Sequence, residues 1–197
     1  MPCLLPPVCQ KCGRAESTGL MCPHCWGWQS CVDGIRSPYR FEGLVRDVIH
    51  AFKYHNYRAL SQRLASLMAG YFEQSKIPGE VLVPVPLHNR RLRERGYNQS
   101  GLLAHELGKR LGIPVAEDAL RRIKDSSPQV RAVSAEARRQ NVEGAFVCER
   151  TDAVKERGVI VVDDVCTSGA TLDACARALK IAGARSVWGL TFARECE

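Results

Sequence analysis

The chain has 197 residues, close to the size of one domain with a short extra segment, and is 45% hydrophobic and 25% charged. This composition excludes a disordered or fibrous chain, and no apolar run approaches the roughly 18 residues of a membrane-spanning helix. The net charge of +7, from 28 basic and 21 acidic residues, favours phosphate or nucleic-acid ligands without requiring them.

The first residues, MPCLLPPVC, contain three prolines and no basic segment, which makes a poor signal peptide. We therefore expect a cytoplasmic protein with no membrane insertion. The chain has 10 cysteines, and most of them fall within the first 31 residues. Clustered cysteines in a protein without an export signal indicate a metal site rather than disulfides.

Two C-x-x-C pairs lie near the N-terminus: Cys9 with Cys12, and Cys22 with Cys25. Each such turn directs two thiolates to one point, and two turns complete a tetrahedron around Zn²⁺. Four protein ligands leave no open position, so we predict a structural zinc whose binding folds a ribbon of residues 1–36. Free or redox-active thiols are the alternative. Cys3, His24 and Cys31 are further candidate ligands, and the sequence does not decide their role.

From residue 37 onward, helical and strand patterns alternate. Apolar side chains at helical spacing predict helices near residues 44–52, 60–71, 102–111 and 171–182. Apolar or β-branched runs predict strands at EVLVPVPL, GVIVVDD and SVWGLTF. Residues 120–142 are polar without a steady period, and we expect a loop followed by a short helix. The alternation predicts an α/β domain, residues 37–197, on a mainly parallel sheet.

The most specific stretch begins where the GVIVVDD strand ends in Asp163 and Asp164. A short hydroxyl-rich loop then leads into a helix, whose first backbone N–H groups form an anion site. The two carboxylates suit sugar hydroxyls or a hydrated Mg²⁺. We predict a sugar-phosphate ligand with its ribose on the carboxylates and its phosphate on Thr167, Ser168, Gly169, Ala170 and Thr171. A retained fold element without a ligand is the alternative.

This stretch resembles the phosphoribosyl pyrophosphate (PRPP) loop of type I phosphoribosyltransferases. The cysteine pairs, HAFKY, VPVPLHNRRLRERGYNQS and RRQNVEGAF extend the resemblance along the chain to one branch of that superfamily, the ComF/GntX family. The resemblance implies a phosphoribosyltransferase-like sheet flanked by helices behind a zinc ribbon, with Mg²⁺ accompanying PRPP. It assigns Pro84 and Val85 to the pyrophosphate loop, residues 121–129 to a flexible loop, and Lys53 to a phosphate contact. Longer relatives carry a second pair of cysteine knuckles, of which only Cys31 remains here.

A run of arginines follows the Pro-Val-Pro loop: Arg90, Arg91, Arg93 and Arg95. The planar guanidinium pairs with phosphate oxygens through two parallel hydrogen bonds, so the run predicts contacts to pyrophosphate or to a DNA backbone. A solvated surface is the ordinary alternative. Unpaired bases stack on aromatic rings, for which the candidates are Trp26, Trp28, Tyr39 and Tyr97.

The family resemblance implies a role in natural transformation and the use of external DNA. We therefore expect a protein that binds single-stranded DNA and a PRPP-type sugar phosphate. One alternative is an active phosphoribosyltransferase using Mg²⁺-PRPP, although the sequence offers no general base and no catalytic residue can be named. Another alternative is an interaction module whose ribbon docks a DNA-uptake helicase or recombination mediator.

Overall fold

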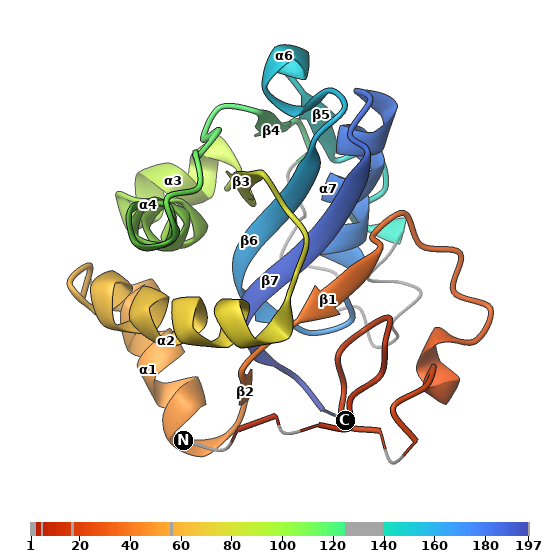
Figure 1. Ribbon diagram of the computed structural model, residues 1–197. Helices are drawn as coiled ribbons and strands as arrows, with labels where there is room; N and C mark the ends of the chain where they lie inside the picture. Colours follow the sequence, from red (N-terminus) through yellow and green to blue (C-terminus); the bar gives the residue numbers. More distant parts are fainter. Residues whose placement is uncertain (1–2, 5, 17, 56, 125–139, 197) are drawn as a thin grey trace.

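The structure is a computed structural model that describes residues 3–4, 6–16, 18–55, 57–124 and 140–196. Its centre is a five-stranded sheet in the order β1, β7, β6, β3, with β2 paired to the end of β7 (Figure 1). The strands are β1 (Gly34–Arg36), β2 (Tyr39–Arg40), β3 (Val81–Pro84), β6 (Gly158–Cys166) and β7 (Ser186–Arg194). All pairings between them are parallel, so the predicted α/β fold on a parallel sheet is confirmed.

Helices cover both faces of this sheet (Figure 1). One face carries α1 (Gly43–Tyr54), α2 (Leu60–Ser75) and α4 (Gln99–Leu111), and the other carries α7 (Ala170–Ile181). The four helices predicted from apolar spacing and the three predicted strands are confirmed. In β6, Val159 and Val161 pack into the α7 core while Ile160 and Val162 pack into the opposite core. This alternation explains why the whole run is apolar, since both faces of the strand are buried.

A two-stranded antiparallel ribbon, β4 (Leu120–Arg122) and β5 (Phe146–Cys148), covers part of the α7 side. The expectation of a loop beginning at residue 120 was wrong, because buried Leu120 and Phe146 anchor the paired strands in the α7 core. Of the flexible loop expected at residues 121–129, residues 125–129 lie outside the described residues, as do residues 130–139 of the segment in which a short helix was expected. A single helical turn, α6 (Thr151–Val154), precedes β6.

The arginine run forms a short helix, α3 (Asn89–Arg95), that the sequence analysis did not anticipate. The side chain of His88 accepts a hydrogen bond from the backbone N–H of Arg90 and caps the first turn. Gly96, at φ 75°, ends the helix in the left-handed conformation that glycine adopts without strain. The helix therefore holds the arginines in a fixed arrangement directly after the Pro-Val-Pro loop.

The cysteine-rich segment contains one 3₁₀ turn, η1 (Pro23–Cys25), and is tied to the sheet by its backbone. The N–H of Ile35 in β1 donates to the carbonyl of Lys11 at 2.8 Å. The sequence predicted that the ribbon ends at residue 36 and the α/β domain begins at residue 37. Residues 34–36, on the ribbon side of that domain boundary, nevertheless form an edge strand of the central sheet. Within the described residues, no helix combines the length and apolar character needed to span a bilayer.

Candidate functional site

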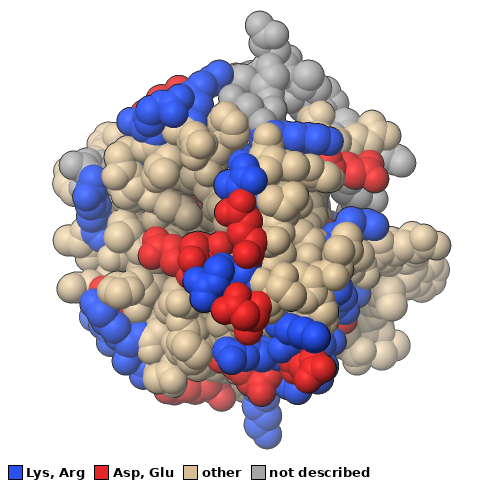
Figure 2. Space-filling view, turned by 90° about the horizontal axis from the view of Figure 1, so that it is seen from above, with Lys and Arg blue, Asp and Glu red and all other residues tan. Residues whose placement is uncertain are grey.

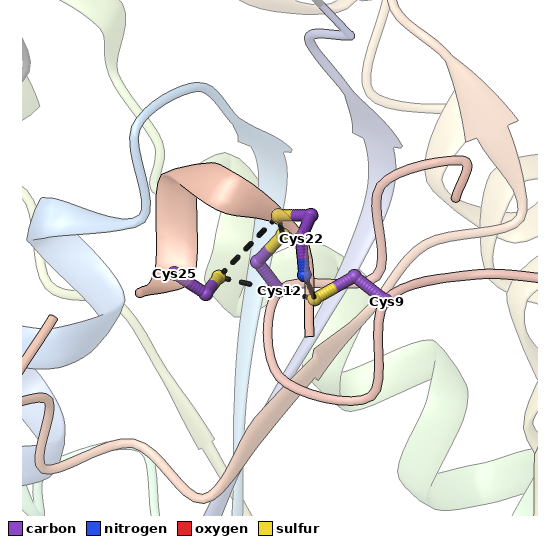
Figure 3. A group of neighbouring side chains, drawn as sticks. All are labelled: Cys9, Cys12, Cys22 and Cys25. Carbon is purple, nitrogen blue, oxygen red and sulfur yellow. Dashed lines mark hydrogen bonds between the residues drawn. The ribbon is translucent and has the colours of Figure 1, made fainter. Parts of the chain in front are cut away.

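Four cysteines converge in the N-terminal segment: Cys9, Cys12, Cys22 and Cys25 (Figure 3). Their ligand atoms all lie within 4.8 Å of one another, with Sγ–Sγ distances of 3.9 Å for Cys9–Cys25, 3.6 Å for Cys12–Cys22 and 3.7 Å for Cys22–Cys25. All four are buried and none forms a disulfide. This group could hold a metal ion, whereas Cys3, His24 and Cys31 lie outside it.

Burial and mutual repulsion make these thiols electrostatically unequal. Burial is the main cause that raises the pKa of Cys25, followed by its proximity to Cys12. At Cys9 burial acts in the same direction, but backbone N–H groups of Cys12, Cys22 and Lys11 outweigh it and lower the pKa to about 6. A site that concentrates so much latent negative charge is suited to a cation.

The acidic pair sits near the end of β6, and each carboxylate has a partner from a helix on the same side of the sheet. Asp164, which is 4% exposed, pairs with Lys53 of α1 across 2.9 Å between Oδ1 and Nζ. Asp163 Oδ1 accepts hydrogen bonds from Ser100 Oγ of α4 at 2.7 Å and from the N–H of Asp164 at 2.9 Å. Burial first, and the charge of Asp164 second, raise the pKa of Asp163 to about 7. The pair therefore carries less than its full charge near neutral pH.

The hydroxyl-rich loop is shorter than predicted, because β6 continues through Val165 and Cys166. It consists of residues 167–169 and leads directly into α7, where Ser168 Oγ accepts a hydrogen bond from the N–H of Ala170 at 3.4 Å. Gly169 adopts φ +84°, and a Cβ there would lie 2.9 Å from the ring of Trp28. Hydroxyl groups and the positive end of a helix dipole thus follow directly after the strand that carries the acidic pair.

The Pro-Val-Pro loop meets the acidic stretch at the same edge of the sheet. The N–H of Val85 donates to the carbonyl of Val162 at 3.0 Å, one residue before Asp163. Asn98 Nδ2 in turn donates to the carbonyl of Val85 at 3.0 Å. Pro84 and Val85 therefore lie next to the acidic pair, because the parallel strands β3 and β6 end at the same edge of the sheet.

A basic depression adjoins this edge and is lined by Lys53, Tyr54, Arg90, Arg91, Glu94, Arg95 and Tyr97. The guanidinium of Arg95 stacks on the ring of Tyr54 at 4.9 Å, and its Nη2 donates to the Tyr54 hydroxyl at 3.2 Å. Lys53 belongs both to this depression and to the ion pair with Asp164. Arg93, which is exposed, is not among the lining residues.

The opposite end of the molecule, where α6 leads into β6, carries a different charge pattern. Figure 2 shows positive and negative side chains side by side on this face. Arg150 pairs with Asp118 at 2.8 Å and Arg185 pairs with Glu80 at 2.7 Å. Mixed charges of this kind satisfy one another and give no uniform field for a polyanion.

Comparison with known proteins places this geometry in a family. Residues 97–194 match the phosphoribosyl transferase domain. The chain is 32% identical over 194 residues to competence protein F of Haemophilus influenzae, covering 93% of this chain and 84% of that protein. It belongs to the ComF/GntX family. It is 30% identical to competence protein ComFC of Bacillus subtilis over 95% of this chain and 78% of that protein. It is 29% identical to DNA utilization protein YhgH of Escherichia coli strain K12, over 91% and 87% respectively.

Solved structures were matched as well. The glutamine PRPP amidotransferase from B. subtilis, complexed with ADP and GMP, has a TM-score of 0.47 at 20% identity, over 71% of this chain and 29% of that chain. A structure of the allosteric regulatory enzyme of purine biosynthesis has a TM-score of 0.46 at 18% identity, over 72% and 29%.

For this ComF/GntX protein, the aromatic residues differ from those that the sequence suggested. Tyr97 is buried and its hydroxyl donates to the carbonyl of Phe52, so the expectation that it stacks on bases was wrong. Tyr39 packs on Phe192 at 5.0 Å between ring centroids. Among the described residues, the exposed rings are Trp26 at 73% and two that the sequence did not suggest, Tyr54 at 59% and Tyr57 at 58%. The HAFKY motif next to a predicted phosphate contact was the available signal for Tyr54.

Proposed function

We propose that this ComF/GntX protein acts in DNA utilisation, in the cytoplasm, by binding single-stranded DNA beside a sugar-phosphate site. The names of its relatives, competence protein F and DNA utilization protein YhgH, support the process. The single observation that carries the proposal is that Lys53 joins a basic, aromatic depression to the acidic pair. We call the residues Lys53, Tyr54, Arg90, Arg91 and Arg95 the basic–aromatic surface.

The basic–aromatic surface has the two properties that a single strand needs. Its arginines supply charge for phosphates, and the exposed ring of Tyr54 supplies a stacking platform for a base. Further rings near Tyr54 extend this stacking surface. The ring centroids of His50 and Tyr54 lie 4.7 Å apart, and those of His55 and Tyr57 lie 6.2 Å apart. Interleaved aromatic rings and arginines are typical of sites that bind unpaired nucleotides without sequence preference.

The sugar-phosphate site would take PRPP, or a related 5-phosphoribosyl compound, with Mg²⁺ as counter-ion of its pyrophosphate. Asp163 and Asp164 would accept hydrogen bonds from the ribose hydroxyls, and residues 167–171 would hold the 5′-phosphate. Pro84 and Val85 would border the pyrophosphate. The donor set fits, because the carboxylates, the hydroxyl-rich loop and the Val85 backbone share one edge of the sheet.

The metal held by the four cysteines is proposed to be zinc. In a tetrahedral site with Zn–S distances of about 2.3 Å, the sulfurs lie about 3.8 Å apart. The Sγ–Sγ distances of 3.6 to 3.9 Å in the cluster match this value. Four cysteine ligands make the site structural, and the ion would fold the ribbon of residues 1–36 against the domain of residues 37–197.

The experiment for the strand is fluorescence anisotropy with a labelled single-stranded oligonucleotide. Replacing Arg90, Arg91 and Arg95 together by alanine should weaken binding at least about tenfold, and Tyr54→Ala should remove one stacking contact. Arg150→Ala, which removes one charge at the opposite end of the molecule, is the matched control and should change the affinity little. Equal affinity of the wild type and the triple variant contradicts the proposal.

The experiment for the sugar phosphate is calorimetric titration of Mg²⁺-PRPP into the zinc-loaded protein. Saturable heat that disappears in the Asp163→Asn, Asp164→Asn double variant supports the site. Absence of heat in the wild type contradicts it and leaves the loop as a retained fold element. The second candidate is an active phosphoribosyltransferase, which the assembled strand, loop and helix favour. Pyrophosphate release that depends on an added nucleophilic acceptor, with the phosphoribosyl group recovered on that acceptor, would establish it.

A third candidate is docking of a DNA-uptake helicase or recombination mediator on the ribbon. Three exposed apolar side chains favour it, namely Leu20 at 60%, Met21 at 49% and Trp26 at 73%. Trp26→Ser should then abolish capture of the partner while oligonucleotide affinity stays unchanged. Loss of both activities together argues against a separate docking role.

A further inference from the structure

Arg194, the last residue of β7, is a buried cation whose environment the proposed function does not explain. It is 1% exposed, and its Nη1 donates to Cys166 Sγ at 2.7 Å. Its Nε is buried without a hydrogen-bond partner, and among the described residues no carboxylate pairs with it. A buried guanidinium needs a counter-charge, since an isolated charge in the interior is costly.

The thiol of Cys166 is the direct contact of this guanidinium, and the thiols of the four-cysteine cluster add further negative charge. Burial acts to lower the pKa of Arg194, but the thiols of Cys166, Cys12, Cys196 and Cys25 outweigh it and raise the pKa. A divalent ion held by four thiolates carries a net charge of about −2, which would complement the guanidinium. A second arginine, Arg36 of β1, contacts the same segment, because its Nη1 donates to the carbonyl of Gln10, between Cys9 and Cys12 in the chain, at 3.0 Å.

The same segment touches the phosphate loop directly. Trp28, whose N–H donates to the Cys25 carbonyl at 3.1 Å, packs both on the four-cysteine cluster and on the α7 core. Its ring lies against Gly169, where any Cβ would approach it to 2.9 Å. Asp173, in the first turn of α7, accepts hydrogen bonds from the N–H groups of Cys31 and Val32 at 2.5 and 3.1 Å.

We infer that Arg194 and Trp28 are positioning residues that couple the four-thiolate metal centre to the sugar-phosphate loop. Arg194 reaches Cys166, immediately before the loop, and Trp28 reaches Gly169, its last residue. The metal centre thus stabilises the conformation of the loop as well as the fold of the ribbon. Loss of the metal makes the backbone of the phosphate site more mobile. This inference rests on the proposed zinc and sugar-phosphate sites.

The test compares full-length, zinc-loaded wild type with Arg194→Met, Arg194→Lys and Trp28→Leu. Zinc release to a chromophoric chelator measures the centre, and amide hydrogen exchange of residues 167–171 measures the loop. Binding of ribose 5-phosphate, followed by calorimetry, measures the site. Arg185→Met, at the other end of the same strand, is the matched control for loss of an arginine.

Arg194 acts on the centre through its charge rather than through a hydrogen bond to a ligand, so we expect zinc to be released faster from Arg194→Met than from the wild type. Loop amides should exchange at least about tenfold faster in Arg194→Met and Trp28→Leu, while β3 amides keep their wild-type rates. Arg194→Lys, which keeps the charge, should lie between Arg194→Met and wild type. Arg185→Met should match the wild type throughout.

Unchanged loop exchange in both Arg194→Met and Trp28→Leu overturns the inference, whatever the zinc does. If Arg194→Met does not fold, Arg194→Lys and Trp28→Leu decide by the same criterion. Faster loop exchange in a protein whose wild type binds neither ribose 5-phosphate nor Mg²⁺-PRPP supports the coupling and refutes the sugar-phosphate function. Variants whose loop amides exchange faster but whose affinity for ribose 5-phosphate is unchanged also overturn the inference, because the metal centre would then not affect ligand binding.

Discussion

Lys53 and Asp164 form an ion pair of 2.9 Å that joins α1 to the end of β6, with side chains 24% and 6% exposed. This contact connects the basic–aromatic surface to the proposed ribose site, so one residue belongs to both. It also neutralises the charge of a buried carboxylate. The stability of the fold and the charge of the site therefore depend on the same pair.

Lys53→Met should destabilise the protein by about 1 to 3 kcal/mol at pH 7.5, because Asp164 loses the partner that compensates its burial. Urea denaturation measures the change. Lys109→Met is the control, because its pair with Glu106 involves a lysine side chain that is 59% exposed and should contribute less than about 1 kcal/mol. Equal losses in the two variants would show that the buried pair has no special role.

The raised pKa of Asp163 predicts how stability changes with pH. Between the ordinary value of 3.8 and about 7, the folded protein holds a proton on Asp163 that the unfolded chain releases. Stability from this group is therefore fully present below pH 3.8 and is lost as the pH rises through about 7. Urea unfolding from pH 4.5 to 7.5 should show a smaller decline in Asp163→Asn than in wild type. Parallel curves for the two proteins would contradict the assignment.

Gly169→Ala should destabilise the protein by about 1 to 3 kcal/mol, because the position combines a positive φ with contact to Trp28. Gly112→Ala is a matched control, since Gly112 has φ +68° but nothing within 4 Å of an added Cβ. It should cost only about 1 kcal/mol, the usual effect of alanine in the left-handed region. The difference between the two thermal unfolding curves isolates the contact with Trp28, and no difference argues against it.

Zinc removal should unfold the ribbon, because its four buried cysteines form their own small cluster and join few other apolar side chains. Metal analysis should find one zinc per chain, and a strong chelator should lower the thermal midpoint. Emission from Trp28, which is partly buried against the cluster, should shift to longer wavelength. A metal-free protein that keeps the wild-type midpoint and spectrum would contradict a structural ion.

The parts of the site that lie close together in the sequence were predictable. The strand, the acidic pair and the hydroxyl-rich loop follow one another in the chain, so their order could be predicted, and the sugar-phosphate ligand at this place remains a proposal. The pairings of Lys53 with Asp164 and of Ser100 with Asp163 join separate helices to one strand, and no spacing in the sequence reveals them. Such pairs become visible only once the fold is known.

The errors have the same origin. In the sequence, Tyr97 resembles a base-stacking residue because it follows the arginines. In the structure its ring is buried and its hydroxyl donates a hydrogen bond to the carbonyl of Phe52. Residues 120–122 look like loop because their strand is short and only Leu120 faces the core. The partner strand that stabilises them, β5, lies beyond a long intervening segment. Tertiary contacts decided each of these cases against the local pattern.

The salt dependence of oligonucleotide binding tests the central claim most directly. For a single strand, the logarithm of the binding constant falls with that of the salt concentration by about 0.7 for each phosphate neutralised. Replacing Arg90, Arg91 and Arg95 together should therefore make the slope shallower by about 2, while Arg150→Ala leaves it unchanged. A salt-independent affinity, or equal slopes for the wild type and the triple variant, would contradict DNA binding at the basic–aromatic surface.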